Sequence, residues 1–278
     1  MENNNIDQRI DERIQKGIKF EFDSFFNTGW KIFKKVFLII AGAVFIMAVP
    51  VLIVYAIMMP FLMGIGSFSQ YMEIIKDNPY YMQQLQRSPI YLLKQSLLTV
   101  IVALITAPIN AGMVKLCRDA DKGEELRFGT IFSYYKAPYF GKLLVTVFIT
   151  TLITSGCGFV FSYIPIVGGL LNLGVILVVY VMLSYVQPLI IFANADIGKA
   201  FSLSFRLAGK TFLPVLGFSL LFGLLCGLGI LACCIGIFFT VAFIPTCHYL
   251  IYKHGVGFPE DEVAEEDNSH WQQQPPTV

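Results

Sequence analysis

Charge is missing from two long stretches of this sequence. Residues 143–195 and 211–247 contain no Asp, Glu, Lys, Arg or His. A single charge at the centre of a membrane-spanning helix costs ~2.5–3.5 kcal/mol on insertion scales, so such stretches indicate hydrocarbon as the surrounding solvent. Charged residues make up 14% of the whole chain, against ~25% in soluble domains. The sequence therefore predicts an all-α, multi-pass membrane protein.

Histidine is also scarce, and no predicted span contains an acidic residue. The three histidines are His248, His254 and His270. A zinc or catalytic site needs two or three such ligands that converge with carboxylates, and His248 fits better as an interfacial residue near the end of a span. We therefore expect no enzyme, no catalytic residue, no metal site and no cofactor. The net charge of +1 does not indicate a nucleic acid partner.

The six cysteines include no CxxC pair. Cys157, Cys233 and Cys234 approach the predicted outer face of the membrane, where a disulfide is allowed. The alternative is that these cysteines are buried and behave as small hydrophobic residues. The sequence leaves both readings open.

Six segments are long enough to span a membrane, which takes ~20 apolar residues. The last two divide the apolar stretch 212–252 into a hairpin, because one helix of ~41 residues would overshoot any bilayer. The alternative for this stretch is a single tilted helix with a buried re-entrant piece. The predicted spans are 36–59, 95–114, 143–163, 167–192, 212–232 and 235–252.

Lysine and arginine lie mostly on one side of these spans. Seventeen of the 20 fall before the first span, in alternate connections or after the last span, whereas only Lys76, Arg87 and Lys94 fall on the other side. Basic residues are enriched in cytoplasmic connections, so we expect both termini in the cytoplasm. We expect no cleavable signal either, since a polar stretch with several acids precedes the first apolar run.

A threefold internal repeat organises the spans. Amphipathic stretches at 22–33, 128–135 and 197–208 precede the first, third and fifth spans, and helices with an aromatic face and basic flanks lie in the headgroup plane. Each returning span carries one proline about two turns before its cytoplasmic end, namely Pro108, Pro188 and Pro245. We predict three pseudo-repeats of interfacial helix plus transmembrane hairpin, at about 20–116, 127–192 and 197–252. Coincidence is the alternative, because membrane helices tolerate proline.

The repeats form one predicted membrane domain, residues 20–254. A polar cytoplasmic N-terminus, 1–19, precedes it, and an acidic, disordered cytoplasmic tail, 255–278, follows it. The outer segment 65–90 is broken by Asn78-Pro79 into two short amphipathic pieces. Its aromatic residues fit membrane anchors, and the alternative is a docking surface for an envelope partner.

One part of the sequence resembles a known pattern. It comprises Gln187-Pro188-Leu189-Ile190, then the run from Ile197 to Arg206, then Gly209-Lys210-Thr211-Phe212. This pattern is similar to one in six-span inner-membrane proteins of bacteria and in the membrane domain attached to some glycerophosphodiester phosphodiesterases. The resemblance implies a helical fold in the bacterial cytoplasmic (inner) membrane. It implies no activity, because the barrel domain that would carry phosphodiesterase chemistry is not among these residues.

The polar residues within the predicted spans are few and uncharged. Asn110 and Gln187, beside Pro108 and Pro188, fit hydrogen bonds to the backbone that the prolines disturb, and a substrate site is the alternative. Gly223 and Gly227 form a GxxxG pair, whose small face lets another helix approach closely, either the sixth span or another protein.

These features favour a non-catalytic accessory or scaffold subunit of a larger membrane assembly, such as one for protein export or envelope biogenesis. The expected partners are membrane lipids and another integral membrane protein, the latter through Gly223 and Gly227. The alternative is a carrier or channel for a lipid or an uncharged small solute. An intramembrane enzyme is the third class, and the sequence offers no convergent acid, base or nucleophile for it.

Overall fold

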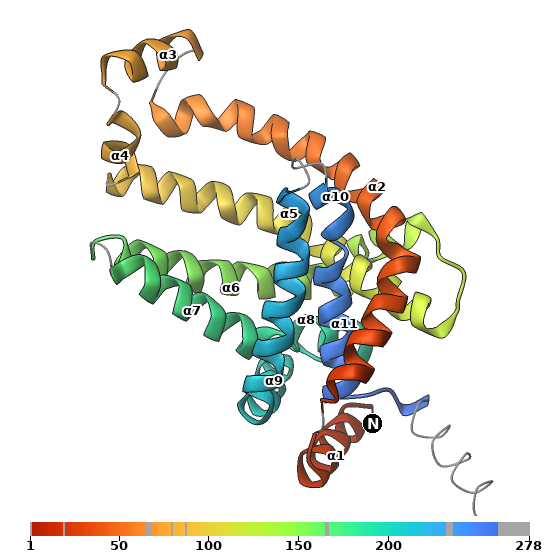
Figure 1. The fold of residues 1–278 in the computed structure, drawn as a ribbon. Helices are drawn as coiled ribbons and strands as arrows, with labels where there is room; N and C mark the ends of the chain where they lie inside the picture. The colour runs from red at the N-terminus through yellow and green to blue at the C-terminus, as the bar shows by residue number, and fades with distance from the viewer. Residues whose placement is uncertain are drawn as a thin grey trace, which may run out of the picture.

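The computed structural model is helical throughout the part of the chain that it describes. That part comprises residues 2–18, 20–64, 68–78, 80–86, 88–164, 167–231 and 236–260, and it contains no strand. The predicted all-α fold is confirmed for these residues (Figure 1). The elements are α1 (Glu2–Lys16), α2 (Phe22–Met63), α3 (Phe68–Asp77), α4 (Tyr81–Gln86), α5 (Pro89–Lys122), the 3-10 helix η1 (Phe128–Tyr135), α6 (Tyr139–Phe161), α7 (Val167–Leu183), α8 (Val186–Ala193), α9 (Ile197–Leu231), α10 (Gly236–Thr240) and α11 (Phe243–Gly255).

Five helical segments are long and apolar enough to cross a membrane. They are Phe22–Leu62, Pro89–Lys122, Tyr139–Phe161, Val167–Ala193 and Ile197–Gly229. These segments overlap the first five predicted spans, and all five direct large apolar side chains outward. An apolar surface of this extent is compatible with a multi-pass protein surrounded by acyl chains.

The sixth predicted span is not one continuous helix. After α9 the chain continues as α10 and α11, and both contact α9. The hairpin of two spans and the alternative of one tilted helix with a re-entrant piece both stay predictions. The helix is interrupted at Val241 and Ala242, four and three residues before Pro245. Proline offers no N–H to the carbonyl four residues earlier, and its ring clashes with that carbonyl, which explains the break. The turn at 232–235 lies outside the described residues.

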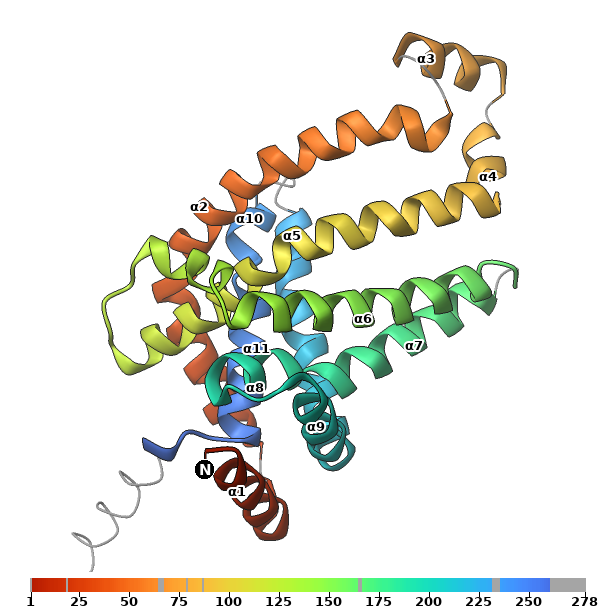
Figure 2. The same ribbon diagram turned by 180° about the vertical axis from the view of Figure 1, so that it is seen from behind.

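The long helices run in two crossing directions. The C-terminal part of α2 extends together with α5, α6 and α7 away from α1, and α3 and α4 lie at the far end of α2 and α5 (Figures 1 and 2). Within this layer α2 contacts α5, α5 contacts α6, and α6 contacts α7. The N-terminal part of α2, most of α9, and α11 run across that direction, and α9 contacts α7, α10 and α11.

The first amphipathic stretch, 22–33, forms no helix of its own. It is the first part of α2 and continues directly into the apolar segment. Its aromatic face packs largely on protein: Phe25 is fully buried, with its ring 3.8 Å from that of Phe218, and Phe33 stacks on Phe243 at 3.9 Å. The expectation that this face lies among acyl chains is therefore wrong for Phe25. Phe22 and Trp30 remain exposed.

The other two amphipathic stretches take different forms. Residues 128–135 form the separate 3-10 helix η1, which packs against α5. Residues 197–208 open α9, and the helix then kinks at Thr211, whose φ of −116° and ψ of 19° are not helical. The three predicted interfacial helices therefore differ from one another in structure.

The N-terminal residues contain a helix that the sequence interpretation missed. In α1 the side chains of Ile6 and Ile10 are buried against the rest of the fold. Ion pairs join α1 to α9, with Asp7 2.6 Å from Lys199 and Asp11 paired with Arg206. The spacing of Ile6, Ile10, Ile14 and Ile18 at i, i+4, i+8 and i+12 is the amphipathic signal that indicates this helix.

The outer segment agrees with its prediction. It forms the two short helices α3 and α4, and α3 ends just before Asn78-Pro79. The side-chain oxygen of Asn78 accepts a hydrogen bond from the Tyr80 N–H at 3.1 Å. Pairing of an Asn side chain with the backbone two residues later stabilises a turn. Tyr80 and Met72 are exposed.

Candidate functional site where three proline-bearing segments meet

A densely buried part of the molecule follows the three prolines of the predicted repeat. It consists of the C-terminal part of α5, of α8 and of α11, and each of these helices contacts the other two. We call these three segments the hub. Its buried residues include Ile109, Ala111, Gly112, Met113, Val114, Leu116, Cys117, Leu189, Ile190, Ile191, Thr246, Cys247, Tyr249, Leu250, Ile251 and Tyr252.

Two of the three prolines interrupt their helices in the same way. The helix breaks at Ser184 and Tyr185, four and three residues before Pro188, as it does before Pro245. The Ser184 hydroxyl donates to the Val181 carbonyl at 2.8 Å. By contrast, α5 passes Pro108 without a break, and the Tyr135 hydroxyl of η1 donates to the Ile105 carbonyl at 2.7 Å. The carbonyl that Pro108 leaves without an N–H donor is that of Leu104, so Tyr135 bonds the neighbouring carbonyl of the same turn, and the predicted role of Asn110 stays a prediction.

Uncharged hydrogen bonds join the hub to its neighbours. His248 Nε2 on α11 lies 2.8 Å from the Tyr180 hydroxyl on α7, so His248 is bonded between helices and is more than an interfacial residue at a span end. The Tyr185 hydroxyl lies 2.9 Å from that of Thr211, at the kink of α9. These bonds join α7 to α11 and the start of α8 to α9 through side chains without a permanent charge.

One polar atom within the spans has no partner in the described part of the chain. Asn172 Oδ1 on α7 is buried and makes no hydrogen bond there. A Cβ on Gly158 of α6 would lie 3.6 Å from Asn172 Oδ1, so this amide faces α6. A buried polar group without a partner costs ~1–3 kcal/mol, so a polar ligand or water would gain most at this position.

Ion pairs gather at one end of the hub, which we call the charged end. It comprises α1, the last turns of α5 and α11, and Glu260. Asp121 accepts from Lys253 Nζ at 2.5 Å and from the Tyr249 hydroxyl at 2.6 Å. Glu260 pairs with Arg118 at 3.3 Å and with Lys122. These contacts tie α5 to α11 and to the residues that follow it.

Several ionisable groups outside the spans have displaced pKa values, among them two acids and one histidine. The hydrogen bond from Lys122 lowers the pKa of Glu260, and that from Lys142 lowers the pKa of Asp196. Burial, with the positive charges of Lys253 and Arg13, lowers the pKa of His254 to about 4. Above pH ~6.5 His254 is neutral in both the folded and the unfolded chain, so it does not lower the free energy of unfolding. As the pH falls from ~6.5 towards 4, the unfolded chain binds a proton at His254 and the folded chain does not, so the free energy of unfolding decreases.

We expect acidification to loosen the charged end through His254. Between pH 7.5 and 5 the cost of keeping His254 neutral should lower the free energy of unfolding by up to about 2 kcal/mol. Carboxylates contribute little in this window, because they titrate lower. The measurement is hydrogen exchange of the α1 and α11 amides at pH 7.5 and at pH 5, in the wild type and in His254→Gln. Equal loss of protection in both proteins would contradict this role of His254.

The cysteines of the described part are free thiols. Cys117, Cys226 and Cys247 are buried and Cys157 is partly buried. Cys233 and Cys234 lie outside the described residues. Because these two are the predicted disulfide partners of Cys157, both readings of the three cysteines stay predictions. Within the described ranges, no group of three or more His, Cys, Asp or Glu side chains could hold a metal ion.

The glycines of α9 divide into open and packed positions. A Cβ on Gly223 or Gly227 would meet no atom within 4 Å. A Cβ on Gly229 would lie 2.7 Å from the Gly236 backbone and 2.1 Å from Thr240 Oγ1, so Gly229 is where α9 packs against α10. The sequence left open whether Gly223 and Gly227 face the sixth span, and among the described residues a Cβ on either glycine would meet no atom of that span.

Comparisons with known proteins give no relative. No family model matches the sequence, and neither a curated protein nor a solved structure is significantly similar to it. The resemblance to bacterial six-span inner-membrane proteins therefore stays a prediction.

Proposed function

We propose that the protein is a non-catalytic subunit of a larger assembly in the bacterial cytoplasmic membrane, where it packs against another integral membrane protein through Gly223 and Gly227. The observation that carries this proposal is the open face of α9. Both glycines have free space above them, and Leu220, Leu224 and Leu228 beside them are exposed. Small residues flanked by leucine let a second helix approach closely in a membrane, where packing drives association.

The proposal includes six spans arranged as three pseudo-repeats. In support, the breaks before Pro188 and Pro245 are alike, so α10 with α11 corresponds to α7 with α8. On this reading α10 and α11 form one interrupted span. Irregular backbone is tolerated at membrane depth where protein covers it, and Ala242 and Phe243 at this break are buried.

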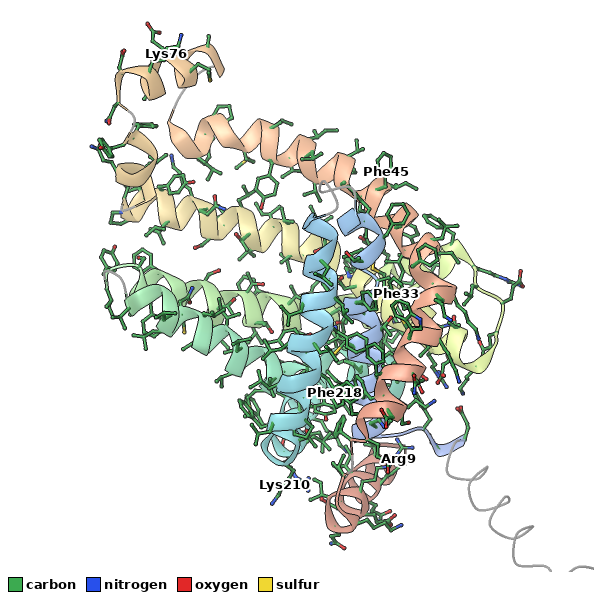
Figure 3. The ribbon with its side chains drawn as sticks, in the orientation of Figure 1. Arg9, Phe33, Phe45, Lys76, Lys210 and Phe218 are labelled. Carbon is green, nitrogen blue, oxygen red and sulfur yellow. The ribbon has the colours of Figure 1, made fainter. Side chains whose placement is uncertain are left out.

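The proposed orientation sets the charged end and both termini in the cytoplasm. It is supported by the basic residues: Lys35, Arg118, Lys122 and Lys253 lie at the charged end, whereas Lys76 lies on α3, at the far end of the long helices (Figure 3). Basic connections face the cytoplasm. Assemblies for protein export or envelope biogenesis fit this location.

A carrier for a lipid or an uncharged solute is the second candidate. The unpaired amide oxygen of Asn172 favours it, together with the His248–Tyr180 pair. These three side chains are polar and carry no permanent charge, which suits a solute without charge. Transport by the purified protein in liposomes would distinguish a carrier from a subunit.

We expect Gly223→Leu combined with Gly227→Leu to insert and fold normally yet lose a co-purifying membrane protein. The leucines occupy free space within this chain but would hold an approaching helix away by several ångströms. The measurement is quantitative mass spectrometry of the protein isolated from membranes after gentle extraction, with an expected loss of at least about tenfold in the partner, or ~1.4 kcal/mol.

The matched control carries Gly169→Leu and Gly174→Leu on α7, which are also open, and should keep the partner. Gly229→Leu is the opposite control and should disturb the α9–α10 packing. Retention of every co-purifying protein by the Gly223/Gly227 variant would argue against this face as the contact.

A further inference from the structure

Arg9 is a partly buried arginine with an unsatisfied donor. It lies on α1, one helical turn before Arg13, where α1 meets the segment after α11 (Figure 3). Its Nε is buried and makes no hydrogen bond within the described residues. A guanidinium keeps its charge under all physiological conditions and offers five donors, so an acceptor that reaches Nε would be stabilised, and an anion most of all.

Arg118 on α5 has the same feature. Its Nε is also buried and unpaired in the described part of the chain. Its guanidinium carbon lies 4.7 Å from the centre of the Phe258 ring and 5.5 Å from that of Phe192, so two aromatic rings hold its plane in place. Glu260 contacts only its terminal nitrogen, Nη2, at 3.3 Å.

Tyr252 joins the two arginines. Arg9, Arg13 and Arg118 all lie close enough for their charges to act on its phenol. The Tyr252 ring lies 5.2 Å from both Phe192 and Phe258, the rings that hold Arg118. On the other side, Arg13 donates to the His254 carbonyl at 3.4 Å. Residues from α1 and α5 thus bring three positive charges within electrostatic range of one phenol on α11.

The nearby acidic groups are engaged elsewhere. Asp7 and Asp11 pair with Lys199 and Arg206, Asp119 pairs with Lys115, and Asp121 pairs with Lys253. Glu260 is shared between Arg118 and Lys122. Within the described residues, these pairs place no carboxylate on Arg9.

We propose that Arg9, Arg118 and Tyr252, with Arg13 behind them, form a binding site for a phosphate group. The planar fork of arginine matches phosphate oxygens with two parallel hydrogen bonds, and a phenol adds a neutral donor. The site lies at the ends of α5 and α11, where an apolar segment gives way to charged residues, the depth of a phospholipid phosphate. A lipid headgroup and a soluble phosphate compound share this chemistry.

The test measures phosphate binding to the full-length protein by native mass spectrometry and by hydrogen exchange of α1. The probes are phosphatidylglycerol in nanodiscs of otherwise zwitterionic lipid, and glycerol 3-phosphate added to the same nanodiscs without phosphatidylglycerol. A bound phosphate bridges Arg9 on α1 and Arg118 on α5, so it should slow exchange of the α1 amides. The probe that binds identifies the source.

Arg9→Gln and Arg118→Gln should each weaken binding by about tenfold or more, because each removes charge-assisted hydrogen bonds. Arg127→Gln is the matched control, since Arg127 is exposed and pairs with Glu125 two residues away, and it should change nothing. Tyr252→Phe keeps the ring packing and should weaken phosphate binding less than the arginine changes do. This variant tests the site even if Arg9→Gln releases α1 from the rest of the fold.

Equal binding by wild type, Arg9→Gln and Arg118→Gln would overturn the proposal, and so would the absence of binding by either probe. A chain truncated after Glu260 gives a third arm. If α1 is protected only when residues 261–278 are present, and phosphate has no effect, then the acidic tail occupies the arginines and the proposal fails. None of these outcomes depends on the α9 contact, so the two proposals fail separately.

Discussion

Replacing Gly112 by Ala should be among the most damaging single-methyl changes in this protein. A Cβ at Gly112 would lie 2.1 Å from the carbonyl oxygen of Ile131 and 2.6 Å from its Cα, because α5 packs directly on the backbone of η1. Backbone cannot move aside as a flexible side chain can, so α5 and η1 must separate. We expect the free energy of unfolding to fall by about 2–3 kcal/mol, measured by thermal unfolding in detergent.

Gly42→Ala is the matched control for this change. Gly42 also lies inside a long helix, α2, but a Cβ there meets no atom within 4 Å. Alanine stabilises a helix interior by about 0.5–1 kcal/mol relative to glycine, so this variant should be neutral or slightly more stable. If both variants melted alike, the close packing of α5 on η1 would not be what constrains Gly112.

Removing the Asp121 carboxylate should have an effect of similar size. Its side chain is 18% exposed and accepts from both Lys253 and Tyr249, which belong to α11. Asp121→Ala leaves the Lys253 ammonium partly buried near Arg13 and His254, with no acid to balance it. Unpaired charges of this kind cost several kcal/mol, and we expect about 2–3 kcal/mol after allowance for partial exposure.

Glu125→Ala is the comparison for an ion pair at the surface. Glu125 pairs with Arg127 at 2.6 Å, but both side chains are about three-quarters exposed. Water screens such pairs, so the change should cost less than about 0.5 kcal/mol. Asp121→Asn should cost an amount of stability between those of Asp121→Ala and Glu125→Ala, because an amide oxygen still accepts from Tyr249. A loss for Glu125→Ala as large as that for Asp121→Ala would contradict the role assigned to burial.

The existence of the long helices could be predicted because it depends on composition alone. The uncharged stretches 143–195 and 211–247 predicted long apolar helices, and the structure forms α6, α7 and α9 over them. The break between α3 and α4 followed from Asn78-Pro79 in the same way, since proline restricts the residue before it.

The interruptions of α7–α8 and α10–α11 were harder to predict. Proline in a membrane helix either kinks it or is accommodated by a neighbour, and which of these occurs depends on tertiary contacts. At Pro108 the Tyr135 hydroxyl from η1 reaches the backbone and α5 continues. At Pro245 the helix stops at Val241 and Ala242. The three prolines look alike in sequence, and only their surroundings separate them.

The parts of the candidate site that could not be predicted depend on contacts between residues that are distant in the sequence. Helical spacing showed that residues 22–33 have an aromatic face, but it could not show that Phe218 of α9 covers Phe25. The Tyr180–His248 bond joins residues of α7 and α11, and neither residue carries a motif. Helix α1 is different, because the regular spacing of its isoleucines was available in the sequence and was outweighed by its polar composition.

The most direct test of the proposed role is the mass of the native particle extracted from bacterial membranes under mild conditions. Mass photometry in nanodiscs, followed by identification of each polypeptide, gives both the size and the composition of that particle. The proposed role predicts a particle well above the 31.2 kDa of one chain that contains a second integral membrane protein. A solitary 31.2 kDa chain that moves a lipid or an uncharged solute across liposomes would contradict it.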